Sequence, residues 1–225
     1  MTTVQLYRLS GLALLVGAVL AAIQSVLSGV LFPDTNNAAA ATNPLNILLG
    51  VVGLVGTILV LLGLPGMYTR SAREGGSLWL IGVVLIAITG MLFGVFFALM
   101  GVLVFPFLAV QAPNLFSEGP PPAFFVFFIV GTLANTLGAL LMGIPMLTKA
   151  LYPRWCGWLM IAEAVLAALS FVINGPSSSG LLSTILNIIS PLPLFIVVAY
   201  AGYLLWSGRI SLAEAAGRAV APQPA

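Results

Sequence analysis

The chain has 225 residues, of which 61% are hydrophobic and only 5% are charged. A soluble domain carries about 25% charged residues, so this sequence cannot cover a water-facing surface. Its mean hydropathy of +1.19 and its recurring runs of about 20 apolar residues predict an all-α integral membrane protein in the lipid bilayer. The basic residues are scattered rather than clustered, which argues against a nucleic-acid partner.

Six apolar runs follow one another, and their uninterrupted apolar character favours helices over the alternating strands of a β-barrel. The expected spans are residues 8–31, 45–65, 78–104, 123–147, 156–173 and 181–206. The first run is longer than the core of a secretion signal, so we interpret it as a retained helix. We expect one transmembrane domain, residues 1–206, and a mobile cytoplasmic tail, residues 207–225.

The basic residues predict the orientation. With six spans, both termini share one side of the membrane with the second–third and fourth–fifth loops. All seven Lys and Arg residues lie on that side: Arg8, Arg70, Arg73, Lys149, Arg154, Arg209 and Arg218. The opposite loops contain Asp34 and Glu118 instead. The positive-inside rule therefore places both termini in the cytoplasm.

The aromatic residues are divided between the two expected interfaces. Trp and Tyr gather on the cytoplasmic side, where amphipathic rings prefer to lie: Trp79, Trp155, Trp158, Trp206, Tyr7, Tyr68 and Tyr152. Phe gathers in the outer half of spans three and four, including Phe93, Phe96, Phe97, Phe124, Phe127 and Phe128. These Phe side chains either pack against lipid and neighbouring helices or form a pocket or partner surface for an apolar molecule.

Missing residue types exclude several chemistries. The chain has no histidine, which excludes His-ligated haem and catalysis by Ser-His-Asp or Cys-His groups. The single Cys156 cannot form an internal disulfide. The only lysine, Lys149, lies in an expected loop, which excludes a Schiff-base retinal within a helix. We therefore expect no enzyme activity, no metal and no cofactor.

Glu163 is the one ionisable residue at bilayer depth, about two turns from the cytoplasmic end of the expected fifth span. Ionisable residues at this depth are costly and point to function. Three interpretations stay open. The carboxylate pairs with a basic loop residue such as Arg70, Arg73 or Arg154, it serves a proton- or solute-linked step, or it is a silent protonated acid.

Span six is interrupted by Asn187, Ser190, Pro191 and Pro193. Each proline lacks an N–H and clashes with the carbonyl four residues back, which predicts a kink or a short unwound segment. Such breaks mark binding sites in some transporters. A static kink, which we favour, would instead be satisfied by neighbouring helices, for example through Thr132 or Asn135 of span four. The candidate ligand or ion residues are Glu163, Asn135, Thr132, Asn187, Ser190, Pro191 and Pro193.

A weak internal repeat relates two segments. Gly63-Leu-Pro65, Thr69-Arg70 and Trp79 parallel Gly143-Ile-Pro145, Thr148-Lys149 and Trp158. Duplication of a hairpin would produce this pattern. The general need of helix ends for a proline stop, a cation and a Trp anchor would produce it as well.

Three short motifs resemble those of uncharacterised six-helix bacterial membrane proteins grouped as domains of unknown function. The motifs are Tyr7-Arg-Leu-Ser-Gly11, Leu64-Pro-Gly-Met-Tyr68 and Leu151-Tyr-Pro-Arg-Trp-Cys-Gly-Trp158. The resemblance implies the bacterial inner membrane and carries no activity with it. Our leading hypothesis is a non-enzymatic accessory or structural subunit, or a binder of an apolar ligand, with a membrane protein or a second copy as partner. The alternative is a small-solute or ion transporter that uses the broken sixth helix.

Overall fold

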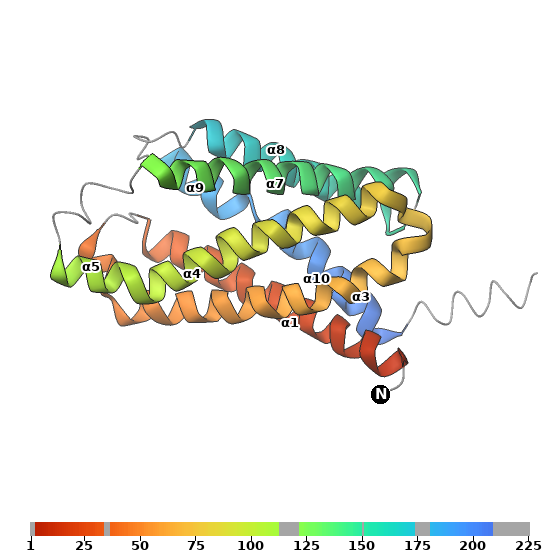
Figure 1. The fold of residues 1–225 in the computed structure, drawn as a ribbon, viewed down its shortest axis with the longest axis horizontal. Helices are drawn as coiled ribbons and strands as arrows, with labels where there is room; N and C mark the ends of the chain where they lie inside the picture. The colour runs from red at the N-terminus through yellow and green to blue at the C-terminus, as the bar shows by residue number, and fades with distance from the viewer. Residues whose placement is uncertain (1–2, 34–36, 113–121, 150, 174–180, 209–225) are drawn as a thin grey trace, which may run out of the picture.

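The computed structural model describes residues 3–33, 37–112, 122–149, 151–173 and 181–208, and the elements in these ranges are all helical. Five helices are long and apolar enough to cross a membrane: Gln5–Leu31, Pro44–Gln111, Phe125–Thr148, Arg154–Ile173 and Leu181–Ser207. Figure 1 shows them running lengthwise in one bundle. The all-α class and the helices of membrane-spanning length are thus confirmed.

The 68-residue stretch Pro44–Gln111 folds back on itself. Within α3 (Pro44–Thr89), Gly76 has φ 68° and ψ −161°, outside helical geometry. On either side of it, Gly90 lies against Leu61 and Gly50 lies against Val102, so the two halves are antiparallel. We call residues 44–75 the first arm and residues 77–111 the second arm; both are visible in Figure 1.

The turn between the arms differs from the prediction. We expected a span to end at Pro65 and a loop to occupy residues 66–77, but Pro65 lies inside α3 and the helix continues to the Gly76 turn. Only glycine adopts a positive φ without a Cβ penalty, so one residue makes the reversal. A single proline in a long apolar helix therefore did not mark the helix end.

The second arm also extends past its expected end at residue 104. It comprises the end of α3, η1 (Gly90–Phe96), α4 (Phe97–Leu99), η2 (Met100–Val104) and α5 (Phe105–Gln111). Both η1 and η2 are π-helical. These wider helical turns were not predicted from the sequence.

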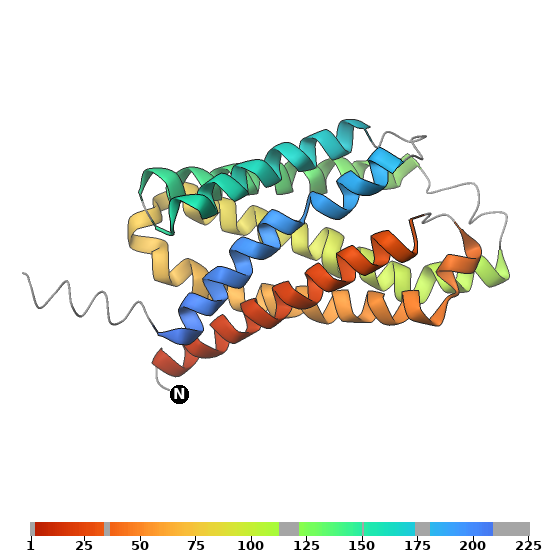
Figure 2. The same cartoon turned by 180° about the vertical axis from the view of Figure 1, so that it is seen from behind.

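The remaining helices complete the bundle. They are α1 (Thr3–Leu31), α2 (Ala38–Ala41), α7 (Pro122–Thr148), α8 (Arg154–Ile173), α9 (Leu181–Ile189) and α10 (Leu192–Ser207). Residues 190–191 separate α9 from α10, so the predicted break in span six is present as a kink (Figure 2). The predicted tail beyond residue 208 lies outside the described residues.

One end of the bundle holds the Gly76 turn, the link between α7 and α8, and both described chain ends (Figures 1 and 2). We call it the basic end, because five basic residues flank these turns and the start of α1: Arg8, Arg70, Arg73, Lys149 and Arg154. The helices approach closely through paired glycines: Gly11 with Gly202, Gly17 with Gly56, Gly82 with Gly138, and Gly143 with Gly157. Without a Cβ at these positions, the backbones come into direct contact.

Candidate functional site

Glu163 lies inside the bundle between α7 and α8, and its side chain is 1% exposed. The Asn135 amide Nδ2 donates a hydrogen bond to Glu163 Oε1 at 2.5 Å. The second oxygen, Oε2, is buried and has no hydrogen-bond partner in the described part of the chain. The contact that holds Glu163 is therefore a neutral amide on the adjacent helix, not one of the basic loop residues suggested by the sequence.

Asn187 contacts a different neighbour. Ser170 Oγ on α8 donates to Asn187 Oδ1 on α9 at 2.9 Å. Ser170 lies about two turns along α8 from Glu163. Helix α8 is thus joined by one polar pair to α7 and by another to α9, and the group that meets the broken helix is on α8 rather than on α7.

The break itself is short. The Ser190 N–H still donates to the Leu186 carbonyl at 2.9 Å, and the Phe195 N–H already donates to the Pro191 carbonyl at 3.2 Å. Within the break, Ser190 and Pro193 are buried and Pro191 is half-buried. Thr132, on α7, is half-buried as well. The structure thus joins Asn135 to Glu163 and Asn187 to Ser170. Two hollows in the protein surface are lined by other residues.

The phenylalanines of spans three and four come together as a contiguous group. We call Phe93, Phe96, Phe97, Phe127 and Phe128 the phenylalanine patch. The rings of Phe96 and Phe127 stack at 5.2 Å between centroids, and those of Phe97 and Phe128 lie 4.9 Å apart, so the patch connects the second arm to α7. Phe127 and Phe128 remain 41% and 36% exposed. The side chain of Phe124 lies outside the described part.

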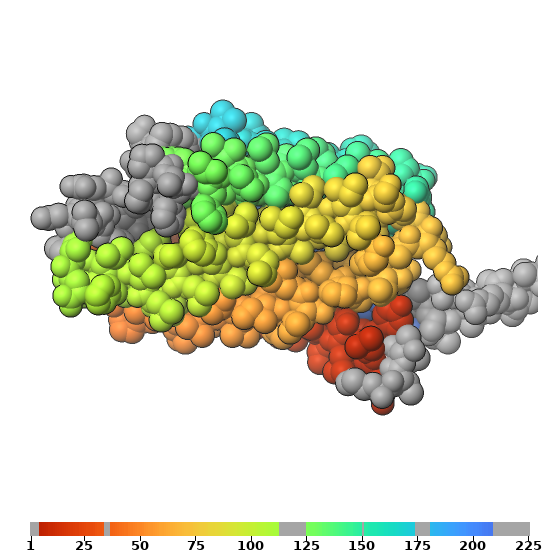
Figure 3. Space-filling view, in the orientation of Figure 1, coloured from red at the N-terminus to blue at the C-terminus, as the bar shows by residue number. Residues whose placement is uncertain are grey.

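The space-filling view in Figure 3 shows the second arm lying against α7 on one face of the molecule. A shallow hollow of about 150 Å³ lies beside the patch, lined by Leu92, Val126, Phe127 and Val130. Phe93 and Phe96 belong to η1, and π-helical turns occur often at functional sites. The patch therefore combines exposed rings, an apolar hollow and unusual backbone.

A cluster at the basic end corrects one expectation about the aromatics. Trp79 and Tyr152 were expected at the lipid interface, but they are 0% and 3% exposed and belong to the core. Their rings stack at 6.0 Å, and Arg70 Cζ lies 5.0 Å from the Tyr152 ring centroid. Burial raises the pKa of the Tyr152 phenol, and the nearby Arg70 charge opposes that shift.

A second cross-link at this end joins the two turns. Lys149 Nζ donates to the Gly75 carbonyl at 3.2 Å, so the end of α7 is tied to the turn between the arms. From the sequence, Arg70 and Lys149 were interpreted as topology signals, and Arg70 also as a possible partner of Glu163; neither of the contacts described here was predicted. Their contacts required the three-dimensional arrangement.

No protein-family model, curated protein or solved structure matches this chain. The resemblance to six-helix bacterial membrane proteins therefore stays a prediction. Any functional assignment rests on the geometry described above.

Proposed function

We propose that this chain is a six-span protein of the bacterial inner membrane with both termini in the cytoplasm. Its role is that of a non-enzymatic accessory or structural subunit that binds an apolar partner through the phenylalanine patch. Counting the two arms as separate crossings gives six spans from five helical stretches, and an even number agrees with both described chain ends lying at the basic end.

The observation that carries the proposal is a difference in location: the polar side chains are bonded inside the bundle, whereas two of the phenylalanine rings lie on its surface. At bilayer depth, Asn135 and Ser170 are engaged in bonds between neighbouring helices, and the Thr89 hydroxyl donates to the Leu85 carbonyl of its own helix at 3.0 Å. These polar groups stabilise the bundle. The rings of Phe127 and Phe128, by contrast, lie on the surface, where an apolar molecule can contact them.

Site-specific photo-crosslinking in the native membrane tests this role. A photoreactive residue in place of Phe127 should give one discrete adduct, either a second copy or a single membrane-protein partner. The matched control position is Leu133, which is 56% exposed on the same helix but outside the patch. Phe128→Ala should weaken the Phe127 adduct. Equal adducts from both positions, or lipid adducts alone, would contradict the proposal.

The orientation requires a different probe from the native cysteine. Cys156 is 0% exposed, so its thiol cannot report which side of the membrane it faces. Ser77→Cys at the basic end and Ala39→Cys in α2 introduce exposed thiols at opposite ends. With a membrane-impermeant thiol reagent on intact spheroplasts, Ala39→Cys should be labelled and Ser77→Cys should not, with the wild-type chain as background. The reverse pattern would invert the topology.

One observation favours transport as a second candidate. Glu163 Oε2 is buried without a partner, and a free carboxyl oxygen in a bundle that also contains a broken helix is a feature of solute and ion pathways. In proteoliposomes, a transporter should show solute-dependent proton flux that Glu163→Gln abolishes while the protein stays folded. Equal flux in the wild type and the variant would rule out this candidate.

A further inference from the structure

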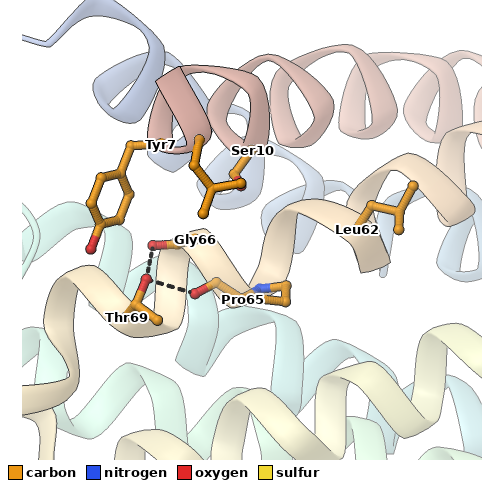
Figure 4. A pocket seen from close by; sticks show the side chains of 7 residues that line it. Tyr7, Ser10, Leu62, Pro65, Gly66 and Thr69 are labelled. Carbon is orange, nitrogen blue, oxygen red and sulfur yellow. Dashed lines mark hydrogen bonds between the residues drawn. The ribbon is translucent and has the colours of Figure 1, made fainter. Parts of the chain in front are cut away.

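A groove runs between α1 and the first arm near the basic end, and Figure 4 shows its walls. Its volume is about 250 Å³, and its lining residues are Leu6, Tyr7, Ser10, Leu62, Pro65, Gly66 and Thr69. The first three belong to α1, and the other four belong to the first arm. No acidic side chain lines it.

The groove is graded from apolar to polar along its length. Leu62 lies farther from the basic end, whereas Tyr7 and Thr69 lie nearer to it (Figure 4). The Thr69 hydroxyl donates to the carbonyls of Pro65 and Gly66, at 2.9 and 3.2 Å, which leaves its oxygen available as an acceptor only. A ligand that fits this gradient has an apolar chain at one end and a polar group at the other.

A cation follows the polar end of the groove. Arg73 comes four residues after Thr69 in the same helix, so the two residues lie on one face, one turn apart. Arg73 is rotated by only about 20° around the helix axis relative to Leu62, because eleven residues complete just over three whole turns. Arg73 is exposed. Its neighbour Glu74 points to another face of the helix, so within the described residues no carboxylate neutralises Arg73 there.

We propose that this groove binds a phospholipid with an anionic headgroup from the leaflet at the basic end. The acyl chain lies along Leu62, the glycerol region lies between Ser10 and Pro65, and the phosphate contacts Arg73. Basic sites between transmembrane helices recognise anionic lipids in this way. The inference requires only that the chain spans a membrane, so it stands or falls separately from the role of the phenylalanine patch.

Lipid binding to the purified full-length chain tests the proposal. Delipidated protein is mixed with dioleoylphosphatidylglycerol or dioleoylphosphatidylcholine, and bound lipid is counted by native mass spectrometry. Arg73→Gln should reduce the preference for phosphatidylglycerol by about fivefold, the effect of one basic residue near the surface. Arg154→Gln removes an exposed cation at the same end outside the groove, and it should leave the preference unchanged.

A second variant tests the groove rather than the charge. Thr69 is exposed and its hydroxyl bonds only within its own helix, so Thr69→Trp should narrow the groove without unfolding the bundle. Binding of both lipids should then fall, with an unchanged circular dichroism spectrum. Equal effects of Arg73→Gln and Arg154→Gln would mean unspecific surface attraction and would overturn the proposal. Displacement of the lipid by inorganic phosphate would also overturn it, in favour of a free anion.

Discussion

The Asn135–Glu163 pair gives the most quantitative test of how this bundle is stabilised. Asn135→Leu removes the donor and leaves Glu163 buried with no partner, which should lower the free energy of unfolding by about 1–3 kcal/mol. Glu163→Met leaves the Asn135 amide unpartnered and should cost a similar amount. The double variant removes both polar groups and fills the space with apolar atoms. It should therefore be more stable than either single variant, because replacing a buried polar pair by apolar residues is often close to neutral.

The coupling energy can be bounded from membrane data. Hydrogen bonds between transmembrane helices average about 0.6 kcal/mol in double-mutant cycles and reach about 1.7 kcal/mol. We expect a coupling energy in the upper half of that range, because the Asn135 amide donates to the carboxyl group of Glu163 and the Glu163 side chain is only 1% exposed. Unfolding in mixed detergent micelles, followed by circular dichroism, measures the free energy of unfolding of the wild type, the two single variants and the double variant.

The control cycle uses Thr132→Val with Glu163→Met. Thr132 lies on α7 one turn from Asn135 and is half-buried, so these two changes should be additive. Independent sites add within about 0.3–0.5 kcal/mol. If the Asn135 cycle is equally additive, the contact contributes nothing to stability, and the argument that α8 is held by polar pairs fails.

Two further outcomes follow from packing and from burial. Gly202→Ala places a Cβ 2.6 Å from the Gly11 carbonyl and should cost about 1–3 kcal/mol of unfolding free energy. At Gly101, apart from the adjacent backbone of its own helix, no described atom lies within 4 Å of an added Cβ, so Gly101→Ala should be neutral or stabilising by up to about 1 kcal/mol. Tyr152 has a raised pKa in the folded state because of its burial, so its contribution to stability is complete below the unfolded phenol pKa of about 10 and is lost as pH rises above it. Unfolding midpoints between pH 8 and 11 should fall in the wild type and fall less in Tyr152→Phe.

The helical class could be predicted because membrane insertion leaves few alternatives. A chain with this little charge has to satisfy its backbone polar groups internally, and long apolar runs do so as helices. The break in span six was also predictable, because Pro191 and Pro193 each remove a backbone donor. These inferences depend on composition and on single residues. They need no knowledge of which helices are neighbours.

Details that depend on neighbours were not predictable. Pro65 was expected to end a helix, but a proline costs only local bonds, and the surrounding helix continued to Gly76. Trp is a residue type that anchors helices at the membrane interface, yet Trp79 is buried in the core, where its ring stacks on Tyr152. Arg70 lies over the Tyr152 ring in turn. Asn135 and Glu163 were both candidates, but 28 residues separate them, and only the antiparallel packing of α7 and α8 brings them together.

The contacts at the basic end add a structural argument to the internal repeat. Arg70 and Lys149 hold equivalent positions in the two segments, and each reaches across to the other hairpin: Arg70 to Tyr152, and Lys149 to the Gly75 carbonyl. Such reciprocal contacts are expected when two copies of one hairpin face each other, whereas a general need for cations at helix ends predicts no partner across the bundle.

The tryptophans at the matched positions of the two segments differ in burial. Trp79 is 0% exposed and Trp158 is 64% exposed, so only one of them lies inside the bundle. This difference in burial predicts unequal mutational costs at the two matched positions. Trp79→Ala should destabilise the fold by about 3 kcal/mol or more, as for a large buried aromatic side chain. Trp158→Ala should change stability by less than about 0.5 kcal/mol. Equal costs would mean that the reciprocal contacts, and not the interior, determine how these two hairpins pack.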